Sequence, residues 1–167
     1  GVDKDLFAVS VSGLLAFAIT PDFETPGDTD GDNRYVVTVT ATDVGGASVS
    51  QDLTISVTDV NESPLITSAA ALSAAENQTA IGTITASDAE GATVTFTLGG
   101  DDAASFSISE AGVLTFAAAP NFESKATYAV TVSVGDGANT TSQALTVSVT
   151  DINEAPVISS SLTLSAA

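Results

Sequence analysis

Two acidic segments of the same design stand one domain length apart in this chain. The first reads Asp59-Val60-Asn61-Glu62-Ser63-Pro64 and the second reads Asp151-Ile152-Asn153-Glu154-Ala155-Pro156. Closely spaced carboxylate and amide oxygens are the hard ligands that Ca²⁺ prefers, at about 2.3–2.6 Å from the ion. A segment that recurs at this spacing also indicates a tandem array. The residues that could do chemistry therefore lie where one repeat meets the next, and the chemistry that suits them is cation binding.

The charge balance leaves these acids with few internal counter-ions. The chain has 21 Asp and Glu residues against 3 Lys and Arg, a formal net charge of −18 at pH 7. Such a chain repels phosphate backbones and anionic lipid, so nucleic acid is excluded as a partner, and without an apolar run of bilayer length no membrane insertion is expected. The chain contains no Cys and no His, which excludes disulfides, Cys/His metal sites and Ser–His or Cys–His nucleophile pairs. Carboxylates without a base, nucleophile or cleft signature predict that the protein is not an enzyme.

The segments between the acidic linkers have the composition and the period of β-strands. Hydrophobic residues make up 44% of the chain but aromatic residues only 5%, because the apolar positions are mainly Val, Ala, Leu and Ile among Thr and Ser. Apolar residues alternate with small or polar ones over 128–134 and over 145–149, which is typical of half-buried strands. Glycines such as Gly91 and Gly112 punctuate the strands as turns should. The pattern predicts an all-β fold of tandem seven-strand antiparallel Greek-key β-sandwiches.

The two copies align segment by segment, but only the second is whole. Residues 35–43 match residues 128–136, and residues 50–59 match residues 142–151. The sequence therefore predicts three parts, which are 1–63 as the C-terminal part of a first repeat, 64–155 as a complete repeat, and 156–167 as the first strand of a third repeat.

The first copy begins at the equivalent of the fourth strand of the second. Gly1-Val2-Asp3 aligns near Gly99-Gly100-Asp101. A remnant of this kind cannot cover its own hydrophobic face and leaves strand edges open. Either the chain is a window of a longer array, or neighbouring chains donate strands. The tail can donate a single strand, which favours the window.

Several short motifs of the second copy, in order, resemble the cadherin repeat. They are Glu76-Asn77, Asp88-Ala89-Glu90, Pro120-Asn121-Phe122-Glu123, Val134-Gly135-Asp136-Gly137 and the linker that begins at Asp151. The resemblance is to the version of this repeat found in tandem in giant bacterial surface adhesins of the RTX type, and it covers the second copy and all of the first that is present. It implies cadherin/Ig-like sandwiches with Ca²⁺ between consecutive repeats, where the ions rigidify a rod.

By position, the resemblance also implies a ligand set at each junction. The first junction would gather Asp22, Glu24, Asp59, Asn61, Glu62, Asp88, Glu90 and Asp136. The second would gather Glu76, Asn121, Glu123, Asp151, Asn153 and Glu154, with Asn121 standing where the family prefers Asp. Without cations such carboxylates would repel and raise one another's pKa values. Removal of Ca²⁺ is therefore expected to leave the sandwiches folded but hinged.

An insertion in the first copy carries a further acidic loop. It spaces Asp28, Asp30 and Asp32 as calcium loops do. Counted as an EF-hand from Asp28, it has Asn33 where glycine belongs and Val39 where the bidentate glutamate belongs. The loop is either an accessory ion site or a solvated acidic turn.

The resemblance implies a calcium-stiffened module on the extracellular cell surface, which holds a distal binding domain of a bacterial adhesin away from the cell. Its partners would be neighbouring repeats of the same protein. Two alternatives stay open. One is a module that binds a cell-surface protein or a polysaccharide, which an exposed aromatic cluster would favour. The other is a fibre subunit assembled by strand donation.

Overall fold

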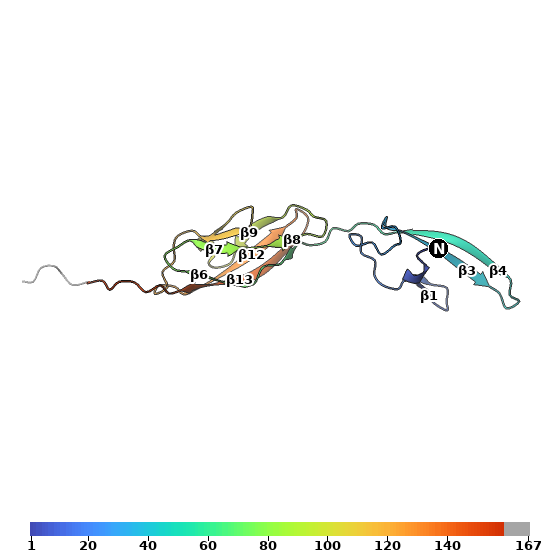
Figure 1. The fold of residues 1–167 in the computed structure, drawn as a ribbon, viewed down its shortest axis with the longest axis horizontal. Helices are drawn as coiled ribbons and strands as arrows, with labels where there is room; N and C mark the ends of the chain where they lie inside the picture. Colours follow the sequence, from blue (N-terminus) through green and yellow to red (C-terminus); the bar gives the residue numbers. More distant parts are fainter. Residues whose placement is uncertain (159–167) are drawn as a thin grey trace, which may run out of the picture. The chain divides into compact units, whose positions relative to one another are not determined.

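The structure is a computed structural model and describes residues 1–158. It divides into two compact units, unit 1 over Gly1–Glu62 and unit 2 from Ser63 onward. Both are built from strands and short 3-10 turns (Figure 1). Within the described residues, no helix has the length and apolar character needed to cross a membrane.

Unit 2 is a sandwich of β-sheets. A four-stranded sheet has the order β6-β13-β12-β9, a three-stranded sheet has the order β10-β11-β7, and β5 pairs with β8. Neighbouring strands are antiparallel except β6, which runs parallel to β13. The elements are β5 Leu65–Ile66, β6 Ala71–Ala75, β7 Ala80–Thr83, β8 Ala86–Ser87, β9 Thr95–Gly99, the 3-10 turn η2 Ala103–Ser105, β10 Phe106–Ile108, β11 Val113–Phe116, β12 Thr127–Gly135 and β13 Thr140–Thr150.

The predicted all-β class is confirmed, but the number of strands per sandwich is not. The described part of unit 2 has nine strands rather than seven, since β5 and β8 appear as separate elements of two residues each. The predicted first strand of a third repeat falls mainly on residues 159–167, which lie outside the described part of the chain.

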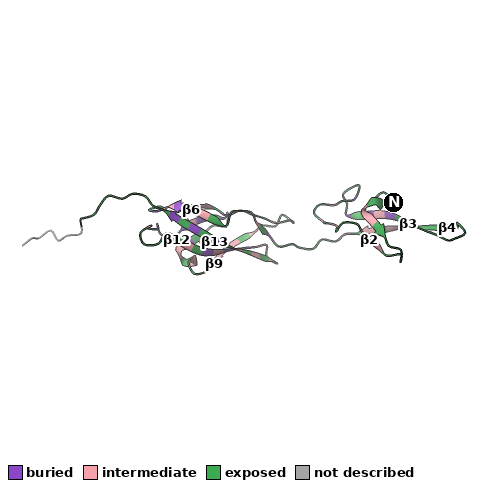
Figure 2. Ribbon diagram, turned by 90° about the horizontal axis from the view of Figure 1, so that it is seen from below, coloured by how far each residue is buried: buried purple, intermediate pink, exposed green. Residues whose placement is uncertain are grey.

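The core of unit 2 lies between its two larger sheets. Val130, Val132 and Val134 of β12 and Leu145, Val147 and Val149 of β13 are buried, whereas Tyr128 is half-buried. Val134 and Val147 have no exposed surface. The burial along the strands is coloured in Figure 2. Leu114 and Phe116 of β11 meet them from the opposite sheet. Full burial of a side chain of this size contributes about 1.5–3 kcal/mol. The period-two pattern therefore selects both the strands and the face that packs.

Unit 1 consists of two β-hairpins. β1 pairs with β2 and β3 pairs with β4, both antiparallel. Tyr35 of β3 is buried, and its ring lies 5.0 Å from that of Phe17, which in turn lies 4.5 Å from Phe7. The elements are the 3-10 turn η1 Lys4–Leu6, β1 Phe7–Val9, β2 Leu15–Phe17, β3 Arg34–Thr42 and β4 Ser48–Ser56.

The aromatic arrangement of unit 1 recurs in unit 2. The rings of Phe106 and Phe116 are 5.0 Å apart, and Phe116 lies 5.2 Å from Tyr128. Like the equivalent trio of unit 1, these rings join a short hairpin to the first strand of the long hairpin. The two units therefore use one packing device at corresponding positions.

Candidate metal centres

Glu76 is the buried centre of an acidic group at one end of unit 2. It follows β6, and its side chain has no exposed surface. Its Oε1 accepts a hydrogen bond of 2.8 Å from the N–H of Ile152, and its Oε2 accepts one of 2.9 Å from the N–H of Phe122. These two donors, Ile152 first, hold the pKa of the carboxyl below its ordinary value. An ionised carboxylate has about four acceptor positions, so each oxygen keeps a lone pair that can face a cation.

Three exposed acids surround Glu76. One carboxylate oxygen each from Glu76, Glu123, Asp151 and Glu154 lie within 4.8 Å of one another. Glu123 comes from the loop before β12, whereas Asp151 and Glu154 belong to the linker that leaves β13. The structure thus brings together four of the residues predicted for the second junction. Such a group of hard oxygens suits Ca²⁺, whose flexible coordination tolerates ligands from several segments.

Asn77 supports this group, although the sequence pattern gave it no role of its own. Its Nδ2 donates a hydrogen bond of 2.9 Å to Oε1 of Glu154, and its N–H donates one of 3.0 Å to the carbonyl of Pro120. Its backbone has a φ of 62°, in the left-handed region that Asn adopts more readily than most residues. In the sequence, the only indication of this role was the position of Asn77 directly after Glu76.

The two asparagines predicted at this junction make local hydrogen bonds. Oδ1 of Asn121 accepts a bond of 2.8 Å from the N–H of Ser124, which closes a turn. Asn153 is exposed, and its Nδ2 donates a bond of 3.4 Å to the carbonyl of Glu154.

The unit 1 residues predicted for the first junction repeat these local arrangements. Oδ1 of Asp22 accepts a bond of 2.9 Å from the N–H of Thr25, the counterpart of the turn at Asn121. Nδ2 of Asn61 donates a bond of 2.9 Å to the carbonyl of Glu62. Glu24, Asp59 and Glu62 are exposed.

The unit 2 residues predicted for the first junction lie in loops that follow strands. After β8, Oδ1 of Asp88 accepts a bond of 3.0 Å from the N–H of Ala92, and Glu90 lies within the same loop. After β12, Oδ1 of Asp136 accepts the N–H groups of Ala138 and Asn139, each at 2.6 Å. That these acids share ions with those of unit 1 stays a prediction.

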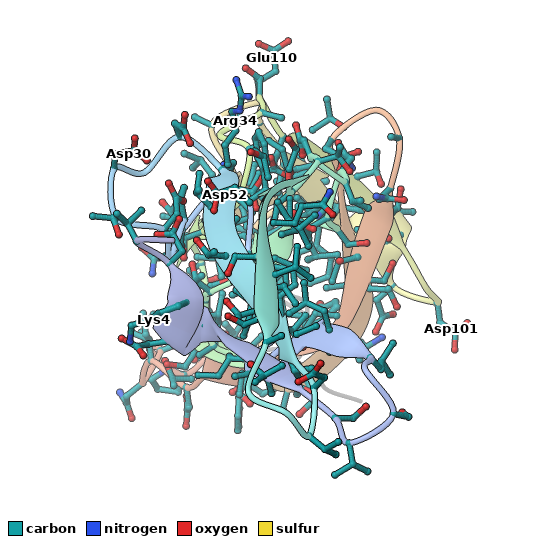
Figure 3. The ribbon with its side chains drawn as sticks, turned by 90° about the vertical axis from the view of Figure 1, so that its right-hand side faces the viewer. Lys4, Asp30, Arg34, Asp52, Asp101 and Glu110 are labelled. Atoms are coloured by element: carbon teal, nitrogen blue, oxygen red, sulfur yellow. The ribbon has the colours of Figure 1, made fainter. Side chains whose placement is uncertain are left out.

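The acidic loop of unit 1 brings its three aspartates together. One carboxylate oxygen each from Asp28, Asp30 and Asp32 lie within 4.8 Å of one another, and Asp30 stands at the periphery of the ribbon (Figure 3). Asp28 is buried and accepts the N–H groups of Asp32 at 2.8 Å and Asn33 at 3.3 Å. The pKa of Asp30 is raised, first by its side-chain hydrogen bond with Asp28 and then by the negative charge of Asp32. The hydrogen bonds fit an acidic turn and the close carboxylates fit an ion site, so both interpretations of this loop stay open.

Comparisons with known proteins place the fold. Residues 61–150 match the family model described as a bacterial Ig domain. Extracellular cadherin domains 1–5 of protocadherin gamma B2 share 22% identity over 89% of this chain and 32% of that chain, with a TM-score of 0.58. Mouse cadherin-23 EC22–24 shares 22% identity over 88% of this chain and 50% of that chain, with a TM-score of 0.57.

A third similar structure is human protocadherin-24 EC1–2, at 23% identity over 55% of this chain and 45% of that chain, with a TM-score of 0.52. The chain spans half or less of the length of each of these structures. The likenesses establish a cadherin- and Ig-like fold, in agreement with the fold class predicted from the sequence. A search of curated protein sequences finds no match to the chain.

Proposed function

The chain belongs to the bacterial Ig domain family, and from this premise we propose that it is a calcium-stiffened structural module of an extracellular bacterial adhesin. Its partners are neighbouring repeats of the same protein, and the RTX-type surface adhesins are the kind of protein that carries it. Its residues 1–63, 64–155 and 156–167 belong to three successive repeats. Ca²⁺ bound where repeats meet fixes the angle between them.

The acidic group around Glu76 is the observation that carries this proposal. Glu76 is held by Phe122 and Ile152, so it is already oriented before an ion arrives. Asp151 and Glu154 are on the linker itself. An ion bound by this group ties the linker to the end of the sandwich, and it therefore sets the direction in which the linker leaves. Rigidity follows from coordination rather than from additional packing.

The same linker design extends the proposal to the first junction. Asp59, Asn61 and Glu62 repeat Asp151, Asn153 and Glu154, and Asp22 with Glu24 stand where Asn121 and Glu123 stand in unit 2. With Asp88, Glu90 and Asp136 they form the ligand set proposed for the first junction. Asp22 replaces a neutral asparagine by a charge, which favours tighter binding of a cation there.

A role in stacking against a sugar or a partner surface is less well supported. The chain has 7 Phe and 2 Tyr, and every one of them is buried or half-buried. Six of the nine form the two aromatic trios that join the hairpins. The exposed aromatic cluster that would favour a binding module is therefore not formed by these residues.

The proposal is tested by adding Ca²⁺ to the chelated chain while thermal stability and small-angle scattering are followed together. A ligand present at 100 times its Kd stabilises the bound fold by about 2.7 kcal/mol. We expect the melting temperature of unit 2 to rise and the particle to become a stiffer rod. In Asp151→Asn the gain in stability falls, whereas Glu110→Gln, an exposed site on the turn between β10 and β11 (Figure 3), keeps it.

If neither stability nor scattering responds to millimolar Ca²⁺, the acidic linkers are solvated spacers. If Asp151→Asn and Glu110→Gln respond to Ca²⁺ like the unchanged chain, the ion does not bind at the group around Glu76.

A further inference from the structure

The chain contains two Asp-Gly dipeptides, and the fold gives them different surroundings. They are Asp30-Gly31 in the acidic loop of unit 1 and Asp136-Gly137 in the turn between β12 and β13. In such a dipeptide the backbone nitrogen of the glycine can attack the side-chain carboxyl carbon of the aspartate, because no Cβ on the glycine shields that nitrogen. The two dipeptides therefore offer the same chemistry, and only their surroundings can make them differ.

Asp30-Gly31 is the exposed tip of a loop that is held on both sides. Before the tip, the N–H of Thr29 donates a hydrogen bond of 3.0 Å to Oδ1 of Asp3, which is buried. After the tip, the N–H of Asp32 donates one of 2.8 Å within the loop. Between these anchors Asp30 and Gly31 are exposed, and Asp30 stands at the periphery of the ribbon (Figure 3). A Cβ on Gly31 would meet nothing within 4 Å, so the carboxyl group has room to turn towards the glycine nitrogen.

The neighbours of the Asp30 carboxyl group favour attack on it. One oxygen of this group lies within 4.8 Å of one oxygen each from Asp28 and Asp32. A hydrogen bond with Asp28, and then the charge of Asp32, raise the pKa of Asp30. A protonated carboxyl group can lose its hydroxyl as water, which a carboxylate cannot do. The cluster therefore adds to the effect of exposure.

Asp136 is held in a way that opposes the same attack. Its Oδ1 accepts the N–H groups of Ala138 and Asn139, each at 2.6 Å, and its side chain is half-buried. These bonds tie the carboxylate to the residues beyond Gly137, so they must break before the carboxyl carbon can reach the glycine nitrogen. A Cβ on Gly137 would also meet nothing within 4 Å, as at Gly31. The difference between the two dipeptides therefore lies in the aspartate.

We propose that Asp30 of the folded chain converts spontaneously to isoaspartate, whereas Asp136 is protected. The nitrogen of Gly31 bonds to Cγ of Asp30, the nitrogen loses its proton and Cγ loses its hydroxyl, so that water leaves and a cyclic imide forms. Water then adds to either carbonyl of the ring. Addition at the main-chain carbonyl breaks its bond to nitrogen and leaves the peptide bond running through Cγ. The net reaction is an isomerisation, and it needs no co-reactant other than water.

The product alters the loop without altering its mass. Isoaspartate inserts a methylene group into the main chain and leaves the free carboxylate on Cα. The carboxylate at position 30 then moves relative to Asp28 and Asp32, so a cation that used all three would bind more weakly. The inference does not rest on the proposed calcium sites, and its test is made in the presence of a chelator.

Peptide mapping compares the two dipeptides within one molecule. The full 167-residue chain is aged in chelator, and isoaspartyl peptides are separated by chromatography and located by fragmentation. We expect isoaspartate at position 30 to accumulate several-fold faster than at position 136. In guanidinium chloride the hydrogen bonds of Asp136 are absent, so the two rates should become similar. No isoaspartate at position 30, equal rates in the folded chain, or the same ratio of rates in the folded and unfolded chains would each overturn the proposal.

Asparagine variants separate access from protonation. Asp30→Asn and Asp136→Asn close the same ring with loss of ammonia, and hydrolysis then raises the mass of the chain, which mass spectrometry follows. The amide is uncharged in both variants, and an amide oxygen at position 136 can still accept the N–H groups of Ala138 and Asn139. We expect Asp30→Asn to gain mass several-fold faster than Asp136→Asn. Similar rates would show that both turns admit the ring equally, and they would overturn the protection proposed for Asp136.

Discussion

Glu76 shows how one carboxylate can serve both folding and ion binding. Glutamate is almost never fully buried without a partner, yet this side chain has no exposed surface. Two backbone N–H groups from segments distant in sequence account for its position, since each donates to a different oxygen. The same donors leave the charge of the carboxylate in place. Glu76 therefore links β6, the loop before β12 and the linker whether or not an ion is present.

The lowered pKa of Glu76 makes acid a probe of this link. The folded state stabilises the ionised form, so the contribution of Glu76 is complete above the ordinary pKa of 4.5 and is lost as pH falls through the lowered value. In chelator, we expect the free energy of unfolding of unit 2 to decrease with acid below pH 4.5. The decrease should be smaller in Glu76→Gln than in Glu110→Gln. Urea unfolding across this range measures it, and equal slopes for the two variants would contradict it.

Asp102 fixes the 3-10 turn of unit 2 in a comparable way. Its Oδ1 accepts a hydrogen bond of 2.5 Å from Nζ of Lys125, and its Oδ2 accepts one of 2.8 Å from the N–H of Ala129. The two contacts, Lys125 first, lower the pKa of Asp102. In unit 1, Asp3 accepts a hydrogen bond of 2.7 Å from the N–H of Val36, which corresponds to that of Ala129. A short acidic side chain thus joins each 3-10 turn to the long hairpin behind it.

Substitution separates this role from simple surface charge. Asp102→Asn loses the ion pair with Lys125 and exchanges one acceptor oxygen for a donor, so unit 2 should unfold at lower temperature. Asp101→Asn, its exposed neighbour, removes the same charge from a side chain that extends away from the ribbon (Figure 3) and should leave the melting temperature nearly unchanged. Calorimetry of both variants in chelator compares them. Equal melting temperatures would show that the contacts of Asp102 contribute nothing.

At the scale of elements, two turn positions require glycine for different physical reasons. Gly91 and Gly112 both have a positive φ, 70° and 76°. A Cβ on Gly91 would have nothing within 4 Å, whereas one on Gly112 would lie 2.2 Å from the carbonyl oxygen of Ile84. That carbonyl belongs to the chain that continues from β7, which pairs with β11. Gly112 therefore allows two neighbouring strands to approach closely as well as allowing a turn.

The two glycines give a matched pair of variants. Gly91→Ala bears only the conformational cost of the left-handed backbone, about 1–2 kcal/mol. Gly112→Ala bears this cost and must also displace the backbone of β7 or β11, so its loss in free energy of unfolding should be clearly larger. Urea unfolding of both variants in the presence of chelator measures the difference. A loss for Gly112→Ala no larger than that for Gly91→Ala would mean that the strands separate easily here.

Sequence pattern predicted the strands better than it predicted their partners. The alternation on β12 and β13 identified the buried faces, because a half-buried strand leaves a period-two record in every residue. The parallel pairing of β6 with β13 left no such record, since register depends on segments far apart in the chain. The separate two-residue strands β5 and β8 are too short to show a period. The hydrogen bonds of Asn77 and Asp102 could not be predicted from the sequence for the same reason, since they join segments that only the fold brings together.

For the candidate sites, repetition supplied what local pattern could not. A single Asp or Glu in a loop of this acidic chain would have carried no information. The recurrence of the linker selected Asp151 and Glu154, and the structure places them beside Glu76 and Glu123. The buried state of Glu76 could not be read from its sequence, because its burial depends on the N–H groups of Phe122 and Ile152, which the fold brings to it from distant segments.

For the whole molecule, the separation of core and charge decides what calcium can control. The residues that make up the buried core of unit 2 are apolar, and all of them except Ile84 lie on the strands of its sheets. The proposed ligands other than Glu76 lie in loops and in the linkers, where most of them are exposed. With a net charge of −18, loss of cations increases repulsion among the acids, but this repulsion acts mainly on the segments that carry them. Calcium should therefore control the linkers and leave the sandwich intact.

Amide hydrogen exchange tests this separation at single residues. On chelation, we expect the slow amides of Val132, Val134 and Val147 to keep their protection, because their strands are held by the apolar core and by continuous ladders. The amides around Asp151 should exchange faster, because the linker is exposed and without an ion is held by isolated hydrogen bonds, from Ile152 to Glu76 and from Asn77 to Glu154, rather than by a ladder. If protection is lost throughout β12 and β13 instead, the ion is needed to fold the unit. The module would then be a calcium-dependent fold rather than a stable sandwich joined by calcium-dependent hinges.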